Sequence, residues 1–471
     1  MVIGAIADSV SRTVEGLTAA VNESLFEPSL RIGVTGLSRS GKTVFLTSLV
    51  ANLIDRGRMP QLTAAAEGRI LSVFLQPQPD DTLPRFDYET HLHALSGPSP
   101  HWPESTRSVS QLRLSMRLRP TGLLSGLQGP RTLHLDIVDY PGEWLLDLAL
   151  LEKSYDDWSA TSLKRLADRP EAAEFRAALA SADPAAPLDE VVAQDLARAF
   201  TGYLQTARQA GYSDCTPGRF ILPGDLAGSP VLTFAPLPTA SATVRGSLRA
   251  EFQRRYDAYK SKVVRPFFRD HFAKLDRQIV LVDILGAIHD GPRAVEDLRQ
   301  TMADILTAFR PGANSWLAGL LGGRRVEKIL FVATKADHLH HSQHPRLTAI
   351  MEAMVKEARA RADYAGAGTG AMSIASLRAT VEETREHNGR TLDLVRGRTL
   401  ADGKQAAFYP GELPEDPSRL LGVARDGGER WLDEQYEFMR FAPSPMNLKP
   451  GEGPPHIRLD RAAQFLIGDR L

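Results

Sequence analysis

The chain has one cysteine, almost no net charge and no long apolar run, and each shortage excludes a class of proteins. Because Cys215 stands alone among 471 residues, an internal disulfide and a Cys-rich zinc site are excluded, which fits a reducing compartment. Cys215 itself is expected to be inert. The formal net charge is −1, so no bulk basic field attracts nucleic acid, and no nucleic-acid partner is expected.

Membrane-directing features are also scarce in the sequence. The N-terminus lacks a basic start followed by an apolar run, and no stretch approaches the ~18 uninterrupted apolar residues of a spanning helix. With 43% hydrophobic and 24% charged residues, the composition is that of a soluble globular protein. We therefore expect a cytoplasmic protein, at most peripheral to the inner membrane.

A glycine-rich segment stands between a predicted strand and a predicted helix. Residues 30–35 form a short β-branched run, and residues 44–54 carry an apolar face. Between them Gly36–Thr43 matches G-x-x-x-x-G-K-[ST] in full, in the context that a phosphate-binding loop requires. Its backbone N–H groups are expected to hold phosphate oxygens at the positive end of the helix. The predicted nucleotide-binding residues of this loop are Gly36, Ser38, Arg39, Ser40, Gly41, Lys42 and Thr43.

A magnesium ion is the cofactor expected beside this loop. Lys42 should reach the β- and γ-phosphates, and the Thr43 hydroxyl should ligate Mg²⁺. The segment Asp-Tyr-Pro-Gly begins at Asp139, directly after a strand predicted over 132–138, and matches the D-x-x-G of the GTPase switch. Asp139 should hold Mg²⁺ through water, and the Gly142 N–H should contact the γ-phosphate.

A third segment predicts that the base is guanine. Residues 334–337 (Thr-Lys-Ala-Asp) follow a strand predicted over 328–333 and match [NT]-K-x-D. The carboxylate of this motif accepts hydrogen bonds from guanine N1 and N2. Adenine has an acceptor at N1 and no 2-amino group, so it would leave the carboxylate unpaired. The predicted base-site residues are Thr334, Lys335 and Asp337, with Ala375 and Ser376 in a looser match to the loop that contacts guanine O6.

Two further positions bear on the geometry of the switch. Thr106 is the best-placed residue to close on Mg²⁺ and the γ-phosphate before a strand predicted over 111–118, and Thr90 and Ser105 remain alternatives. Asp283–Gly286 also fits D-x-x-G, but it lies where a Ras-like fold has its next central strand. We interpret that second match as a coincidence.

The hydrolytic residues are Arg39, Lys42 and Glu143. Glu143 stands where many GTPases have a water-orienting Gln, and both a catalytic role and a turn toward a surface base are open. Arg39 occupies the loop position of the P-loop arginine in guanylate-binding proteins. It is therefore a candidate arginine finger supplied in cis, and the alternative is a solvated arginine that only attracts phosphate.

The order of the predicted elements indicates how the chain is divided. Residues 57–110 are rich in Pro, Gly and polar side chains and are expected to be irregular, and a further strand is predicted over 279–285. The expected parts are an N-terminal amphipathic helix over 1–29, a P-loop core over 30–144 and 276–385, a mainly helical insertion over 145–275, and a C-terminal extension over 386–471.

Four stretches resemble the YcjX-like family, bacterial P-loop proteins described as stress-associated and GTPase-like. They are Gly33–Thr43, Asp139–Asp147, His456–Asp460 and Gln464–Asp469. The resemblance runs over essentially the whole chain. It implies a Ras-like domain with a large helical insertion after switch II, a bacterial cytoplasmic setting, a link to the envelope-stress response and a small inner-membrane partner protein.

Together these features predict an α/β fold: a Ras-like P-loop domain with a mixed, mostly parallel sheet, a large helical insertion and a small α+β extension. The predicted function is that of a regulatory switch that binds GTP and GDP with Mg²⁺ and hydrolyses GTP. The alternatives are a nucleotide-binding scaffold with negligible turnover and an ATP-using P-loop protein. A protein partner is expected through the insertion or the C-terminal region, and dimerisation remains open.

Overall fold

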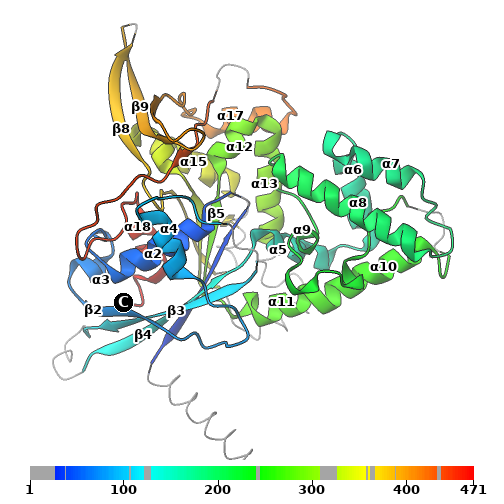
Figure 1. Ribbon diagram of the computed structural model, residues 1–471, viewed down its shortest axis with the longest axis horizontal. Helices are drawn as coiled ribbons and strands as arrows, with labels where there is room; N and C mark the ends of the chain where they lie inside the picture. The colour runs from blue at the N-terminus through cyan, green and yellow to red at the C-terminus, as the bar shows by residue number, and fades with distance from the viewer. Residues whose placement is uncertain are drawn as a thin grey trace, which may run out of the picture.

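A seven-stranded mixed sheet lies at the centre of the molecule (Figure 1). Its strands are β1 Ser29–Gly36, β2 Ile70–Gln76, β3 Ser110–Leu118, β4 Arg131–Asp139, β5 Arg277–Val282, β6 Lys328–Ala333 and β7 Gly368–Ser373. They follow the order β2-β3-β4-β1-β5-β6-β7, in which β3 is antiparallel to β2 and β4 and the other neighbours are parallel. The computed structural model describes residues 27–37, 39–104, 108–120, 129–239, 244–307, 326–356, 359–360, 366–387, 389–431 and 436–471.

The central strands are apolar on both faces because both faces are covered. In β5, Ile279 and Leu281 point into one hydrophobic cluster, and Val280 and Val282 point into the other. The first cluster contains α2 (Lys42–Ile54), α4 (Tyr88–Ser96) and α18 (Leu459–Ile467). The second contains α12 (Ile284–Asp290), α13 (Pro292–Thr307), α15 (His344–Met354) and α17 (Pro417–Arg425).

The residues between β4 and β5 form a lobe of helices, to the right in Figure 1. Trp158 stacks on Tyr256 at its centre, with the ring centroids 5.1 Å apart. Both side chains belong to the cluster that also covers Val280 and Val282, so the core of the lobe continues onto the sheet. The helices are α5 Gly142–Leu146, α6 Tyr155–Leu166, α7 Ala173–Ala180, α8 Glu190–Gln209, α9 Gly218–Ile221, α10 Leu248–Tyr259 and α11 Arg265–Asp270.

Short helices join these elements. The π-helix η5 (Lys260–Val264) connects α10 to α11, and η7 (Ala336–His338) and η8 (His341–Gln343) follow β6. The remaining ones are α3 Thr63–Ala66, η1 Asp147–Glu152, η2 Pro170–Ala172, η3 Gly224–Leu226, η4 Pro230–Leu232 and η6 Phe272–Lys274.

A small second sheet follows β7 and projects from the upper left of Figure 1 as a long hairpin. In it β9 (Arg390–Thr399) pairs with β8 (Thr380–His387), β10 (Gln405–Phe408) and β11 (Phe441–Ala442), all antiparallel. Because β8 begins at Thr380, the expected boundary at residue 386 falls inside a strand. In the part of the chain that the structure describes, no helix combines the length and apolar character needed to cross a lipid bilayer.

The strands predicted over 111–118, 132–138 and 328–333 are confirmed, and two other predictions are wrong. Residues 57–110 are not irregular, because they contain β2 and α4. The strand β2 lacks the alternation of apolar and polar residues that predicts a strand, because it lies at the sheet edge and leaves Leu71 and Phe74 exposed. The strand predicted over 279–285 ends at Val282, and the helix predicted over 1–29 falls almost wholly outside the described residues.

The strand β5 ends at Val282 because the next residue, Asp283, caps the following helix. The Asp283 side chain accepts a hydrogen bond from the Gly286 N–H at 3.0 Å and so caps α12. The second D-x-x-G match is therefore a helix cap, which agrees with its interpretation as a coincidence.

Candidate functional site

A cavity of about 320 Å³ lies where β1, β6 and β7 end. One end is lined by the glycine-rich loop and the other by the loop after β6. Ligands of open α/β sheets bind at the carboxyl ends of the strands, and this cavity has that position. Of the sequence-predicted residues, it brings together Gly36, Arg39, Ser40, Gly41, Lys42, Thr43, Glu143, Thr334, Lys335, Asp337, Ala375 and Ser376.

The glycine-rich loop is tightly curled. A Cβ on Gly36 would lie 2.1 Å from the Ser40 hydroxyl oxygen, so only glycine fits there. Gly41 has a φ of 78° and Arg39 a φ of 63°, both in the left-handed region. The Ser40 N–H donates to the Leu37 carbonyl at 3.1 Å. Ser38 lies outside the described residues.

Lys42 and Asp139 form an ion pair beneath this loop. The Lys42 ammonium lies 2.9 Å from Asp139 Oδ1 and donates to the Tyr140 carbonyl at 3.0 Å. Asp139 is 1% exposed, and apart from this ion pair its oxygens have no hydrogen-bond partner among the described residues. A buried carboxylate with accepting capacity left over and the Thr43 hydroxyl at the start of α2 are oxygen donors of the kind that Mg²⁺ prefers. These residues therefore fit the expected ion.

The switch segment passes directly against the glycine-rich loop. A Cβ on Gly142 would lie 2.3 Å from the Gly36 carbonyl oxygen, so a larger residue would push the two segments apart. Gly142 does not line the cavity but begins α5 at its edge. The next residue, Glu143, is buried, and its carboxylate pairs with Arg208 of α8 at 2.8 Å.

Two arginines lie at this end of the cavity: one belongs to the insertion, and the other contacts it. Arg208 comes from the last turn of α8 and lines the cavity. Arg39 is exposed, and its guanidinium donates to the Gln209 carbonyl, at the carboxyl end of the same helix, at 3.2 Å. A lone bond to a neutral carbonyl is weaker than the buried ion pair of Arg208 with Glu143. Arg39 is thus the more easily released of the two cations.

Asp337 is held in place at the other end of the cavity. Its carboxylate accepts a hydrogen bond from the Ala379 N–H at 2.9 Å, and its backbone carbonyl accepts one from the Thr380 hydroxyl. Lys335, with a φ of 61°, pairs with Asp283. Its ammonium lies 5.4 Å from the centroid of the Phe438 ring.

The loop at Ala375 and Ser376 is supported by the C-terminal segment. The Ala375 N–H donates to the Ile457 carbonyl at 3.1 Å, and the Ile457 N–H donates back at 2.8 Å. The Arg458 guanidinium donates to the Ser373 carbonyl and hydroxyl at 3.2 and 3.0 Å. Because the Ala375 N–H already donates to the Ile457 carbonyl, the N–H of Ser376 would have to donate to guanine O6.

Several lining residues were not predicted from the sequence. Phe438 stacks on His338 with ring centroids 4.9 Å apart, and the Trp102 indole N–H donates to the Phe441 carbonyl at 2.8 Å. No local motif marks Phe438 or Trp102, because they reach the cavity only through tertiary packing. The unpredicted lining residues that close its walls are Trp102, Pro103, Arg208, His338, Leu377, Leu400, Phe438, Arg440 and Phe441.

The candidates for the switch threonine separate in the structure. Thr106 and Ser105 lie outside the described residues, and Pro103 just before them lines the cavity. Thr90 is exposed on α4, where its N–H is capped by Asp87, and it does not line the cavity. Thr90 is thus not positioned at the cavity, and the choice of Thr106 stays a prediction.

Comparison with known proteins agrees with this fold. A family model described as "YcjX-like family, DUF463" matches residues 30–471. A protein of Escherichia coli (strain K12), named Ras-like GTPase YcjX, is 38% identical over 477 residues, covering 98% of this chain and all of the relative. A protein of the same name from Shewanella oneidensis is 35% identical over 468 residues, covering 94% of each chain. The α/β fold is thus confirmed as the Ras-like P-loop type, and the chain belongs to the YcjX-like family.

Proposed function

We propose that this chain binds GTP with Mg²⁺ and hydrolyses the γ-phosphate slowly, as a regulatory switch. The observation that carries the proposal is the single cavity with a phosphate loop at one end and the Asp337 carboxylate at the other. Its two ends match a triphosphate and the donor edge of guanine. The printed name of both relatives, Ras-like GTPase, supports the same assignment.

Binding of a triphosphate would replace the ion pair between Lys42 and Asp139 with one between Lys42 and the phosphates. Lys42 now pairs with Asp139, and a bound triphosphate would draw its ammonium toward the phosphate oxygens. Thr43 and Asp139 would hold the Mg²⁺ ion, which supplies positive charge to the β- and γ-phosphates when bound. The Asp139 carboxylate thus takes the place of the phosphate beside Lys42 in the free protein.

Arg39 is the residue we propose to stabilise the transition state. Its guanidinium needs only to leave the Gln209 carbonyl to reach the γ-phosphate end of the loop from which it projects. Glu143 would orient the attacking water after release from Arg208. The same contacts link phosphate occupancy to the insertion, since Arg39 and Glu143 both touch the end of α8. We propose that a protein partner reads this change on the insertion, in a stress response.

A second candidate is a nucleotide-binding scaffold with negligible turnover. It is favoured by one observation: the Glu143 carboxylate is buried in an ion pair with Arg208. If that pair persists when the triphosphate is bound, no carboxylate is available to orient water.

Phosphate release by the purified chain tests the proposal. We expect release from GTP in Mg²⁺, with none in EDTA and little from ATP. Tight GTP binding without release in any condition would instead support the scaffold. Preference for ATP would contradict the guanine assignment.

A further inference from the structure

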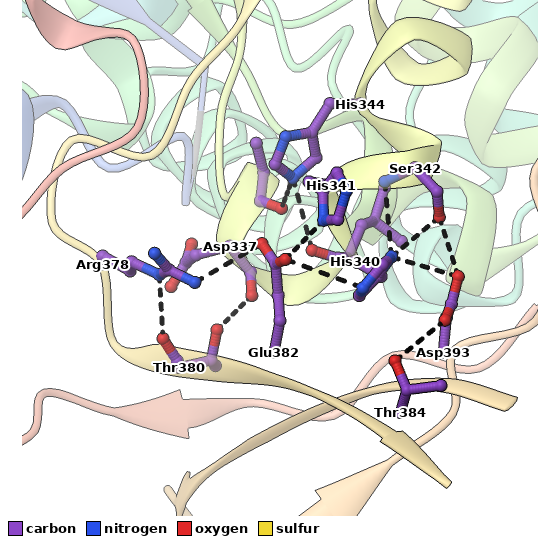
Figure 2. Close-up of polar contacts among 12 residues, drawn as sticks. Asp337, His340, His341, Ser342, His344, Arg378, Thr380, Glu382, Thr384 and Asp393 are labelled. Atoms are coloured by element: carbon purple, nitrogen blue, oxygen red, sulfur yellow. Dashed lines mark hydrogen bonds and ion pairs between the residues drawn. The ribbon is translucent and has the colours of Figure 1, made fainter. Parts of the chain in front are cut away.

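A cluster of metal-ligating side chains lies beside the cavity but outside it. Figure 2 shows His340, directly before η8, and His341, the first residue of η8, facing Glu382 on β8. One ligand atom from each of these three residues lies within 4.8 Å of the others. The three residues form what we call the histidine–glutamate cluster.

The ligand atoms of this cluster converge. Glu382 Oε2 lies 2.6 Å from His341 Nδ1 and 3.7 Å from His340 Nε2. Two ligands at about 2.0–2.2 Å from a tetrahedral ion lie about 3.4 Å apart. The 3.7 Å separation is close to that value. The 2.6 Å contact is a hydrogen bond between His341 and Glu382 that a bound ion would replace.

The outer contacts orient the ligands toward one another. The Nδ1 atom of His340 lies 3.1 Å from Asp393 Oδ2 and 2.9 Å from the Ser342 hydroxyl, on the side away from Glu382 (Figure 2). The Ser342 N–H also donates to this Nδ1 at 3.4 Å. For Nε2 to bind an ion, Nδ1 would have to carry the proton and donate it to Asp393 instead. Carboxylate–histidine pairs of this kind fix the ligand tautomer at metal sites.

Arg378 contacts one oxygen of Glu382 and leaves the other free for the histidines. Its guanidinium donates to Oε1 at 3.4 Å, whereas Oε2 faces His340 and His341. The ligand set is therefore two imidazoles and one carboxylate, a combination that Zn²⁺ takes with a fourth position open to water.

We propose that His340, His341 and Glu382 bind one divalent transition-metal ion, with Zn²⁺ the best match. Imidazole nitrogen favours Zn²⁺ over the hard ions Mg²⁺ and Ca²⁺, which separates this site from the one at Thr43 and Asp139. The side chain of His341 is 69% exposed, so an ion can enter from solvent.

The site would fasten two segments that also hold Asp337. Its histidines follow Asp337 in the loop after β6, and Glu382 lies on the strand that begins with Thr380. Thr380 already donates to the Asp337 carbonyl. A bound ion would therefore join the loop to β8 and stiffen the support of Asp337, whatever ligand the neighbouring cavity takes.

Zinc titration of the metal-free, full-length chain tests this proposal, with no nucleotide present. A chromophoric chelator that competes for Zn²⁺ reports both stoichiometry and affinity. We expect one tight equivalent for the wild type, and tetrahedral Co²⁺ absorption when cobalt replaces zinc. Because His341 is exposed, His341→Ala should fold normally and weaken binding by at least about 100-fold. Asp393→Asn, which removes the outer carboxylate, should weaken it by about 10–100-fold.

The matched control is His93→Ala, which removes another exposed histidine, on α4. It should leave zinc affinity unchanged. Equal zinc affinity in the wild type and His341→Ala, or displacement of Zn²⁺ by millimolar Mg²⁺, would overturn the proposal.

Discussion

The two ends of the cavity are built in different ways. At the phosphate end, the loop Gly36–Thr43 and the segment that begins at Asp139 supply most of the lining or lie directly beneath it. At the base end, the loop after β6 meets Leu400, directly after β9, and side chains from β11 and the segment before β11, which lie more than sixty positions along the chain. Short contiguous motifs after β1 and β4 thus build most of the phosphate end, although Lys42 and Tyr140 lie 98 positions apart, whereas side chains outside any motif complete the base end. Substitutions at the two ends should therefore differ in how strongly they weaken nucleotide binding.

The largest expected effect is at the phosphate end, with Lys42→Ala. Removing one member of a buried charge pair formed with a ligand costs about 2–5 kcal/mol, so nucleotide affinity should fall by about 30-fold or more. Fluorescent GTP binding measures it. Lys42→Met keeps the apolar stem of the side chain and should lose as much nucleotide affinity as Lys42→Ala. Unchanged affinity in both would show that the loop does not grip phosphate.

The next effect separates the two arginines beside α8. In Arg39→Ala, single-turnover hydrolysis should fall by about 100-fold or more while GTP affinity changes little, since a finger acts mainly in the transition state. In Arg208→Ala, Glu143 loses its buried partner, and unfolding free energy should fall by about 1–3 kcal/mol. If only Arg208→Ala abolishes hydrolysis, the insertion supplies the catalytic charge instead.

A smaller effect is expected at the base end, with Phe438→Ala. Loss of an aromatic contact costs about 0.5–1.5 kcal/mol, so nucleotide affinity should fall by about 3–10-fold. The loss should be similar for GTP and ATP, because a ring face does not distinguish donors at the base edge. Tyr409→Ala, a half-exposed aromatic of the same region that does not line the cavity, is the control. A loss confined to GTP would mean that Phe438 acts through Asp337.

The smallest effect concerns the packing of the insertion behind the switch. Burial raises the pKa of Asp147 to about 6 from its ordinary 3.8, against the opposing hydrogen bonds from the Tyr259 hydroxyl and the Gly218 N–H. The folded state therefore holds an extra proton between those values, and stability is lost as pH rises through 6. From pH 8 to pH 5 the wild type should gain about 1 kcal/mol relative to Asp147→Asn in urea unfolding. A constant difference would contradict the raised pKa.

These differences explain what the sequence could predict. Gly36, Lys42 and Asp139 belong to short contiguous motifs, so the sequence identifies them, although Lys42 and Asp139 meet only in the folded chain. Phe438 and Arg208 reach the cavity only because β11 and α8 pack beside it, and nothing local marks them. The strand β2 was missed for a related reason, since an edge strand with exposed Leu71 and Phe74 lacks a clean alternation.

Nucleotide specificity of Asp337→Asn tests the central claim most directly. Asparagine can keep the hydrogen bond from the Ala379 N–H, so the base site should retain its shape. Binding of GTP, ATP and xanthosine triphosphate would be measured for wild type and variant. We predict that the wild type prefers GTP and that the variant binds GTP about 100-fold more weakly while gaining affinity for the xanthosine nucleotide, whose base edge accepts rather than donates at the 2-position. A wild type that prefers ATP, with a variant that changes nothing, would contradict the account.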